Sequence, residues 1–161
     1  MRYLPPFVLT FCWAMWFGGI ITLLLAVSAV FGEFPLEHRA TAGKATAAMF
    51  RAFGLYELAL AAGAMIGAVA LRLRYPSALR TAIFVLLALS AIAASVTTGV
   101  VTPAIEELRR AGESNTVDFK RLHGQAMMLF ASRTLLLLVV GVLLPNALQL
   151  APREALNNDR I

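Results

Sequence analysis

The sequence predicts an all-α fold, a membrane-embedded four-helix bundle with a short surface helix between spans three and four. Three observations lead to this fold class. Hydrophobic residues make up 60% of the 161 residues and charged residues only 14%, which leaves too few polar side chains to cover a soluble domain. The apolar residues form four long runs, each close to the roughly 20 residues that a helix needs to cross hydrocarbon. The runs and their connections use nearly the whole chain, so we predict one membrane domain.

We predict the first span at about residues 6–31 and the second at about 46–71. The first run is longer than the roughly 7–15 apolar residues of a signal peptide, so we interpret it as a retained helix. The second span is rich in small residues, and Gly63 and Gly67 form a G-x-x-x-G pattern. Small residues let two helices approach closely in lipid. We expect this pattern to pack within the bundle rather than to form a dimer face.

The third and fourth spans are predicted at about 79–102 and 119–148. Between them, the charged stretch from Pro103 to Arg110 predicts the surface helix, with proline at its first position. Gly112 is expected to stop that helix. The membrane domain then covers residues 1–151, and the polar segment 152–161 is predicted to be a flexible tail.

Two charged residues, Glu57 and Arg133, lie well inside predicted spans. Charges within a bilayer are costly and usually face the bundle interior or water. Spans two and four start from the same side of the membrane, and both residues lie at comparable depth, roughly 16 Å into the span for Glu57. An opposite charge within reach relieves both desolvation penalties. We therefore predict an ion pair between Glu57 and Arg133.

Helical phase predicts the surroundings of this pair. Ala61, Ala64 and Ala68 share the face of Glu57, and this stripe leaves space for a long side chain from a neighbouring helix. On span three, Ser95, Thr98 and Thr102 form a hydroxyl stripe that we expect to face the interior, although bonding back to helix carbonyls is its more common role. The predicted interior polar site comprises Glu57, Arg133, His123, Arg51, Thr98 and Gln125.

Arg51 has two further interpretations, because it lies only a turn or so from the start of its span. Its guanidinium is expected to reach the lipid headgroups, or to pair with an acidic residue of the 106–118 segment. The central pair also has two interpretations. It is either a locked ion pair that sets helix register, or part of a polar pocket for an anion, a proton or a small polar solute.

Other kinds of site find little support. No catalytic motif is present, and we predict no metal site and no cofactor. Cys12 is the single cysteine. A two-histidine site at His38 and His123 needs further ligands. Glu37 and Asp118 are near in sequence, but no H-x-x-x-H or cysteine spacing is present. The formal net charge is +5, but the basic residues lie at span ends, where they suit headgroups and topology better than nucleic acid. We therefore expect no nucleic-acid partner.

Several short segments, in order along nearly the full chain, together resemble a bacterial family of small four-helix membrane proteins of unknown function, the transmembrane protein 205-like domains. These segments are Trp16-Phe17-Gly18-Gly19, Ala42-Gly43 with Met49-Phe50, Pro103-Ala104-Ile105, and Phe119 with Leu122-His123-Gly124. The resemblance implies a four-helix bundle and no established reaction. Eukaryotic relatives are associated with drug or metal-complex resistance, which implies transport or trafficking. A more distant similarity joins the chain to copper-resistance and porphyrinogen-oxidase proteins, but those oxidases carry a histidine in their first span and this chain has none there.

These observations favour a non-enzymatic integral membrane protein, either a small transporter component or an accessory or structural membrane subunit. The alternative is a membrane oxidoreductase that binds haem or porphyrin and uses His123 and Arg51. The partners that we consider are the lipid bilayer and a homo-oligomer or larger membrane complex.

The predicted location is a bacterial inner membrane, crossed several times. Lysine and arginine divide evenly between the two sides, so the positive-inside rule alone does not set the orientation. We expect cytoplasmic termini, because the very short turn between spans two and three carries Arg72, Arg74 and Arg80.

Overall fold

The computed structural model describes residues 4–114 and 116–158, with side chains at all of these positions except 36, 39 and 150–158. Within this part the chain forms helices that are joined by short connections. The elements are α1 (Leu4–Glu33), the short 3-10 turn η1 (Leu36–His38), α2 (Arg39–Arg74), α3 (Ala78–Val96), the π-helical segment η2 (Thr97–Val101), α4 (Thr102–Arg110) and α5 (Val117–Asn158).

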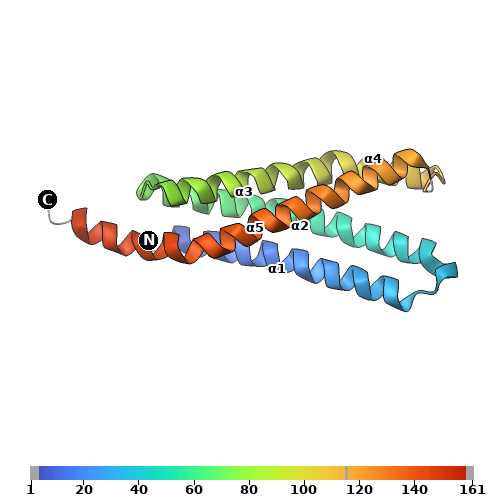
Figure 1. The fold of residues 1–161 in the computed structure, drawn as a ribbon, viewed down its shortest axis with the longest axis horizontal. Helices are drawn as coiled ribbons and strands as arrows, with labels where there is room; N and C mark the ends of the chain where they lie inside the picture. The colour runs from blue at the N-terminus through green and yellow to red at the C-terminus, as the bar shows by residue number, and fades with distance from the viewer. Residues whose placement is uncertain (1–3, 115, 159–161) are drawn as a thin grey trace.

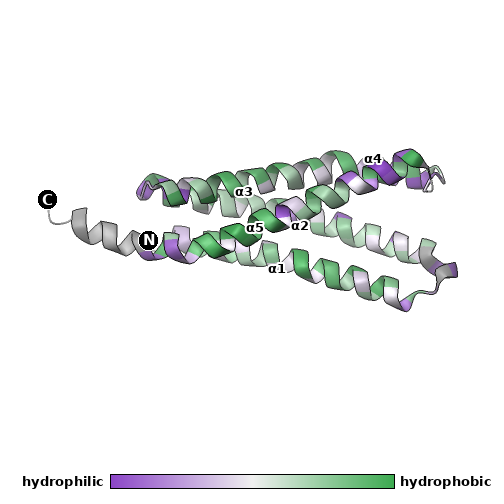
Figure 2. Ribbon diagram, viewed as in Figure 1, coloured by the Kyte–Doolittle hydropathy of each residue, from purple (hydrophilic) through white to green (hydrophobic). Residues whose placement is uncertain are grey.

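Four stretches are long and apolar enough to cross a membrane, which confirms the predicted all-α four-helix architecture. They are Leu4–Glu33, Ala40–Arg74, Ala78–Arg110 and Val117–Gln149. Hydrophobic residues follow the middle of the helices, and hydrophilic residues gather mainly toward their ends (Figure 2). At about 1.5 Å per residue, helices of this length exceed the ~30 Å hydrocarbon core. Their charged ends therefore extend into the headgroup layers.

The helices run up and down along one long axis (Figure 1). The turn η1 joins α1 to α2 at the same end of the bundle as the connection from α4 to α5. The turn between α2 and α3 lies toward the other end, as does the start of α1. This topology places the beginnings of α2 and α5 at the same end of the bundle, as the prediction of a Glu57–Arg133 contact requires.

The predicted separate surface helix is not confirmed. Residues Thr102–Arg110 are helical, but α4 continues from α3 through η2 as one long helix. Pro103 has no N–H to donate to the carbonyl four residues earlier. The preceding residue, Thr102, donates its N–H to Thr97 O, five residues back. A single π-helical turn of this kind accommodates the proline without ending the helix.

Side-chain and glycine caps set the helix boundaries at the turns. Ser77 Oγ accepts a hydrogen bond from the Arg80 N–H at 3.3 Å and begins α3. Thr116 Oγ1 accepts from the Phe119 N–H at 3.3 Å and begins α5. Gly112, at φ +78°, follows α4, and the Glu113 N–H donates to Leu108 O at 2.9 Å. This Schellman arrangement confirms Gly112 as the stop signal.

Glycines bring α1 close to α2 and α5. A Cβ atom added to Gly67 would lie 2.8 Å from the backbone nitrogen of Leu9, and one added to Gly63 would lie 2.6 Å from Cys12 Sγ. The G-x-x-x-G pattern is therefore used inside the bundle, as predicted. Gly141 on α5 packs against the Trp13 ring, whose Nε1 donates to Leu137 O at 2.8 Å.

Helix α5 runs to Asn158, so its backbone continues into the segment 152–161 for which we predicted a flexible tail. The mobility of that segment stays a prediction, and residues 159–161 lie outside the described part of the chain.

Candidate functional site

Glu57 on α2 and Arg133 on α5 form the predicted ion pair. Arg133 Nη1 lies 2.9 Å from Glu57 Oε2, and the two side chains are only 2% and 1% exposed. Neither Nη1 nor Nε of Arg133 is aligned for a hydrogen bond with any group in the described part of the chain. The contact is therefore mainly a charge attraction, which is strong here because both groups are shielded from solvent.

Two aromatic side chains complete the cluster. Trp16 of α1 donates its Nε1–H to Glu57 Oε1 at 2.7 Å, and this indole is fully buried. On the other side, the Arg133 guanidinium carbon lies 4.6 Å from the Phe130 ring centroid, within range of a favourable cation–π contact. Each carboxylate oxygen of Glu57 thus has a partner of its own. One side chain links three helices, α1, α2 and α5.

The alanine stripe beside Glu57 forms as predicted. Ala61, Ala64 and Ala68 are all buried. They belong to the same hydrophobic core as Leu137, Val140 and Leu144 of α5, which are buried too. Small side chains on α2 leave the width that the long arginine side chain needs.

The other four residues of the predicted interior site do not join this pair. Arg51 is exposed and bonds Glu106 through Nη1 at 3.0 Å, which is the second of its sequence interpretations. Thr98 is half-buried and packs close to Gly54 of α2. His123 is exposed and stacks on Phe119 with ring centroids 6.1 Å apart. Gln125 is also exposed.

The expectation that Ser95, Thr98 and Thr102 all face the interior is wrong in part. Ser95 is exposed and faces away from the core, whereas Thr98 and Thr102 are half-buried. The neighbouring Thr97 bonds back to Ala93 O at 2.8 Å, the common role of a hydroxyl in a membrane helix. The π-helical segment adds backbone within one turn, and a phase calculated for a regular α-helix does not allow for that change.

Sequence reasoning missed two interior polar contacts. Trp16 was not connected with Glu57, although an indole N–H inside an apolar helix needs an acceptor. By sequence, Arg80 counts among the basic residues of the turn between spans two and three, but it is only 1% exposed. It donates to Tyr75 O at 2.5 Å and to Ala147 O at 3.2 Å, and so ties the α2–α3 turn to α5. The available signal was its helical phase, because Arg80 shares a face with the apolar residues Ile83 and Leu87.

Within the described residues, no three His, Cys, Asp or Glu side chains lie close enough together to hold a metal ion. His38 lies 3.9 Å from Glu37, its neighbour in the sequence, and His123 is on a different helix. The structure thus brings the two histidines into no shared ligand set in this part of the chain.

Comparison with known protein families gives a match. A family model described as "Domain of unknown function (DUF4149)" matches residues 11–114, about two thirds of the chain. The matched range covers Trp16, Glu57 and Arg51 but ends before α5, which carries Arg133. No curated protein and no solved structure matches the chain.

Proposed function

This chain belongs to the family described as Domain of unknown function (DUF4149), and from that premise we propose that it is a non-enzymatic, multi-pass membrane subunit. It acts as an accessory or structural component of a larger membrane assembly, which includes the case of a transporter component. The proposal extends to the resemblance to transmembrane protein 205-like domains and to a bacterial inner membrane with cytoplasmic termini.

One observation carries the proposal. The interior acid and base are used by the protein itself, because Glu57 meets Trp16 with one oxygen and Arg133 with the other. The Glu57 side chain is only 1% exposed, so a substrate would have to displace one of these partners to reach either oxygen. Removing one partner of a buried pair leaves an uncompensated charge, which costs free energy. Because a shift of one helix along the other would separate the two charges, the pair fixes the register between the helices.

The outer surface supports a role within lipid and beside other helices. Large apolar side chains are exposed on every long helix, among them Phe7, Leu55, Ile92 and Val142. Phe7 and Phe11 stack on the outside of α1 with centroids 5.9 Å apart. Such faces suit acyl chains, and they suit a second copy or a partner helix equally well. We therefore include a homo-oligomer or a hetero-oligomeric complex in the proposal.

The proposed orientation rests on the short turn between α2 and α3. Arg72 and Arg74 are exposed there, and short basic loops stay on the cytoplasmic side. Both termini share that side in a protein with four spans.

The test is to extract the protein from its native membrane in polymer-bounded lipid discs and to measure the particle mass and the visible spectrum together. We expect a protein mass above that of one chain and no Soret band. A disc that holds one copy and no partner would contradict the subunit role. A Soret band that co-purifies in fixed proportion would replace it with the alternative, an oxidoreductase that binds haem or porphyrin.

A matched pair of variants separates a purely structural role of the Glu57–Arg133 pair from a further role in the assembly. Glu57→Gln alone should lower the yield of the assembly, because Arg133 then stays buried without its counter-charge. Glu57→Gln combined with Arg133→Leu should recover part of that yield. A double variant that folds as well as the wild type but fails to assemble would show that the pair does more than hold the helices together.

A further inference from the structure

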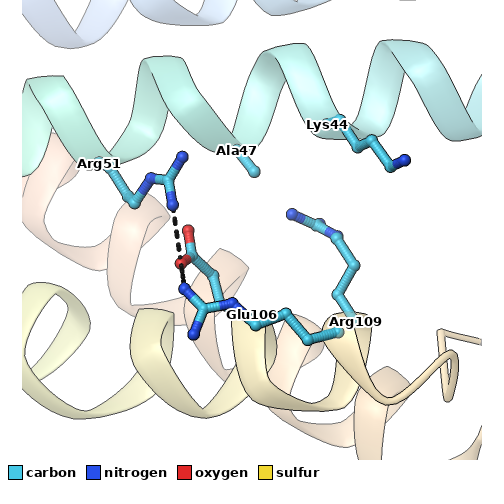
Figure 3. A pocket seen from close by; sticks show the side chains of 6 residues that line it. Lys44, Ala47, Arg51, Glu106 and Arg109 are labelled. Carbon is cyan, nitrogen blue, oxygen red and sulfur yellow. Dashed lines mark hydrogen bonds and ion pairs between the residues drawn. The ribbon is translucent and has the colours of Figure 1, made fainter.

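A second group of charged residues surrounds a pocket at one end of the bundle, apart from the buried pair. The pocket has a volume of about 400 Å³ and lies between the first turns of α2 and the end of α4. Its lining residues are Lys44, Ala47, Arg51, Glu106, Arg109 and Arg110. In Figure 3, Arg51 from α2 and Arg109 from α4 extend toward the space beneath Ala47. Four of the six lining residues are basic and one is acidic.

Glu106 organises two of these cations. Its Oε2 lies 3.0 Å from Arg51 Nη1 and 3.6 Å from Arg110 Nη2. The Glu106 side chain is 14% exposed, whereas those of Arg51 and Arg110 are 54% and 79% exposed. One half-buried carboxylate therefore contacts two guanidinium groups at the mouth of the pocket. Each of them keeps donor groups free for another acceptor, because a guanidinium has five N–H groups.

The other two cations have no acidic partner among the described residues. Lys44 is exposed and forms no ion pair there. Arg109 lies over the Phe119 ring, with its guanidinium carbon 5.9 Å from the centroid. This stacking orients the guanidinium without neutralising it. The pocket lining has four basic residues and one acidic residue, so it carries a net positive charge after Glu106 is neutralised.

The depth of the pocket places it among lipid headgroups. Along α2, the rise from Arg51 to Arg72 is about 32 Å at the usual helical rise, close to the ~30 Å thickness of the hydrocarbon core. Arg51 therefore lies at one boundary of the hydrocarbon if Arg72 lies at the other. Lys44, roughly 10 Å further out, reaches the outer part of the headgroup layer. Phosphate groups are the main anions of that layer.

We propose that this pocket binds a phosphate-bearing anion, with Arg51, Arg109 and Lys44 as its direct ligands and Glu106 as the residue that positions Arg51 and Arg110. Arginine forks match phosphate oxygens in pairs, and lysine adds a point charge. The volume exceeds that of one phosphate group, so the ligand carries further atoms. The same chemistry is offered by an anionic lipid headgroup and by a free phosphate ester, and the experiment separates these sources. All six lining residues lie within the range that the family model matches.

The binding test uses the purified full chain in an uncharged detergent, titrated by calorimetry with two phosphate probes. One is pyrophosphate, and the other is short-chain phosphatidylglycerol below its micelle concentration. Phosphatidylcholine of the same chain length controls for acyl-chain binding. We expect saturable binding of one phosphate probe per chain, weakened by added salt. Preference for phosphatidylglycerol identifies a lipid headgroup as the source, and preference for pyrophosphate identifies a free phosphate ester. If neither probe saturates, the proposal is wrong.

Matched variants test the location. Lys44→Gln combined with Arg109→Gln should weaken binding by about tenfold or more, because two charged ligands are lost. Arg121→Gln removes an exposed charge at the same end of the bundle that does not line the pocket. It should change affinity by less than about twofold.

An equal loss in both variants would reveal general surface attraction and overturn the assignment. If the double variant does not fold, Lys44→Gln alone gives the same comparison at an exposed position. A Glu106→Gln variant should weaken binding less than the loss of the direct ligands does. Acetate added to the titration should not compete with the phosphate probe, because a single carboxylate does not span the pocket.

Discussion

Arg133 Nη1 lies 2.9 Å from Oε2 of Glu57, and both side chains are almost completely withdrawn from the surface of the bundle. The two residues come from α2 and α5, which begin at the same end of the bundle. Their depth along each helix was readable from the sequence. The pairing then follows from the cost of leaving either charge alone in an apolar environment.

The first prediction concerns the coupling within this pair. Glu57→Gln alone should destabilise the protein by about 3–5 kcal/mol, because Arg133 keeps a buried charge without a partner. Adding Arg133→Leu should recover part of that loss, since no buried charge then remains. Thermal or denaturant unfolding in detergent measures both values. A double variant less stable than Glu57→Gln alone would contradict the pairing argument.

The second prediction concerns the link to α1. Trp16→Phe removes the hydrogen bond from Nε1 to the Glu57 carboxylate and leaves a gap, so the free energy of unfolding should fall by about 2 kcal/mol. Trp13→Phe is the matched control, because Trp13 donates to a neutral backbone carbonyl, Leu137 O. Its effect on unfolding should be the smaller of the two. Equal losses would mean that the charge on Glu57 adds nothing to the bond with Trp16.

The third prediction concerns the close approach of α1 and α2. Gly67→Ala places a methyl group 2.8 Å from the backbone nitrogen of Leu9, and the backbone gives way less easily than a side chain. The cost should be about 1–3 kcal/mol. Gly18→Ala is the control on α1, where an added Cβ meets nothing within 4 Å. That change should leave the free energy of unfolding unchanged or slightly increased, since alanine favours helix.

The fourth prediction concerns orientation and uses single cysteines in a Cys12→Ser background. Leu73, 80% exposed at the α2–α3 turn, should react as Leu73→Cys with a membrane-impermeant maleimide only after the cells are permeabilised. Ser114→Cys, at an exposed position in the connection between α4 and α5, should react in intact cells. Reversed labelling of the two positions would reverse the proposed topology.

Much of the interior was predictable because it depends on local helical geometry. The spacing of Ala61, Ala64 and Ala68 predicts a stripe beside Glu57, and the structure buries all three. The G-x-x-x-G pair Gly63 and Gly67 predicts a close helix contact, and that contact forms with α1. These features follow from rise and rotation per residue along one helix.

Other features depend on how whole helices rotate against one another, which no single run of sequence specifies. His123 and Gln125 lie on the exposed part of α5, although each is only about 80° from Arg133 in helical phase. A side chain at this angle lies in the interior or on the surface, depending on which neighbouring helix packs beside it. The burial of Arg80 depends likewise on the path of α5, because its acceptor Ala147 lies on that helix.

The sequence by itself determined that four helices cross a membrane and that an acid and a base inside them face each other. Hydrophobic run length and the cost of unpaired charge in lipid are local quantities. The tertiary structure alone decided that Trp16 donates a hydrogen bond to the second carboxylate oxygen of Glu57. It decided as well that a π-helical turn before Pro103 joins α3 to α4. It also decided which cations surround Glu106, because contacts between distant segments depend on the crossing and rotation of entire helices.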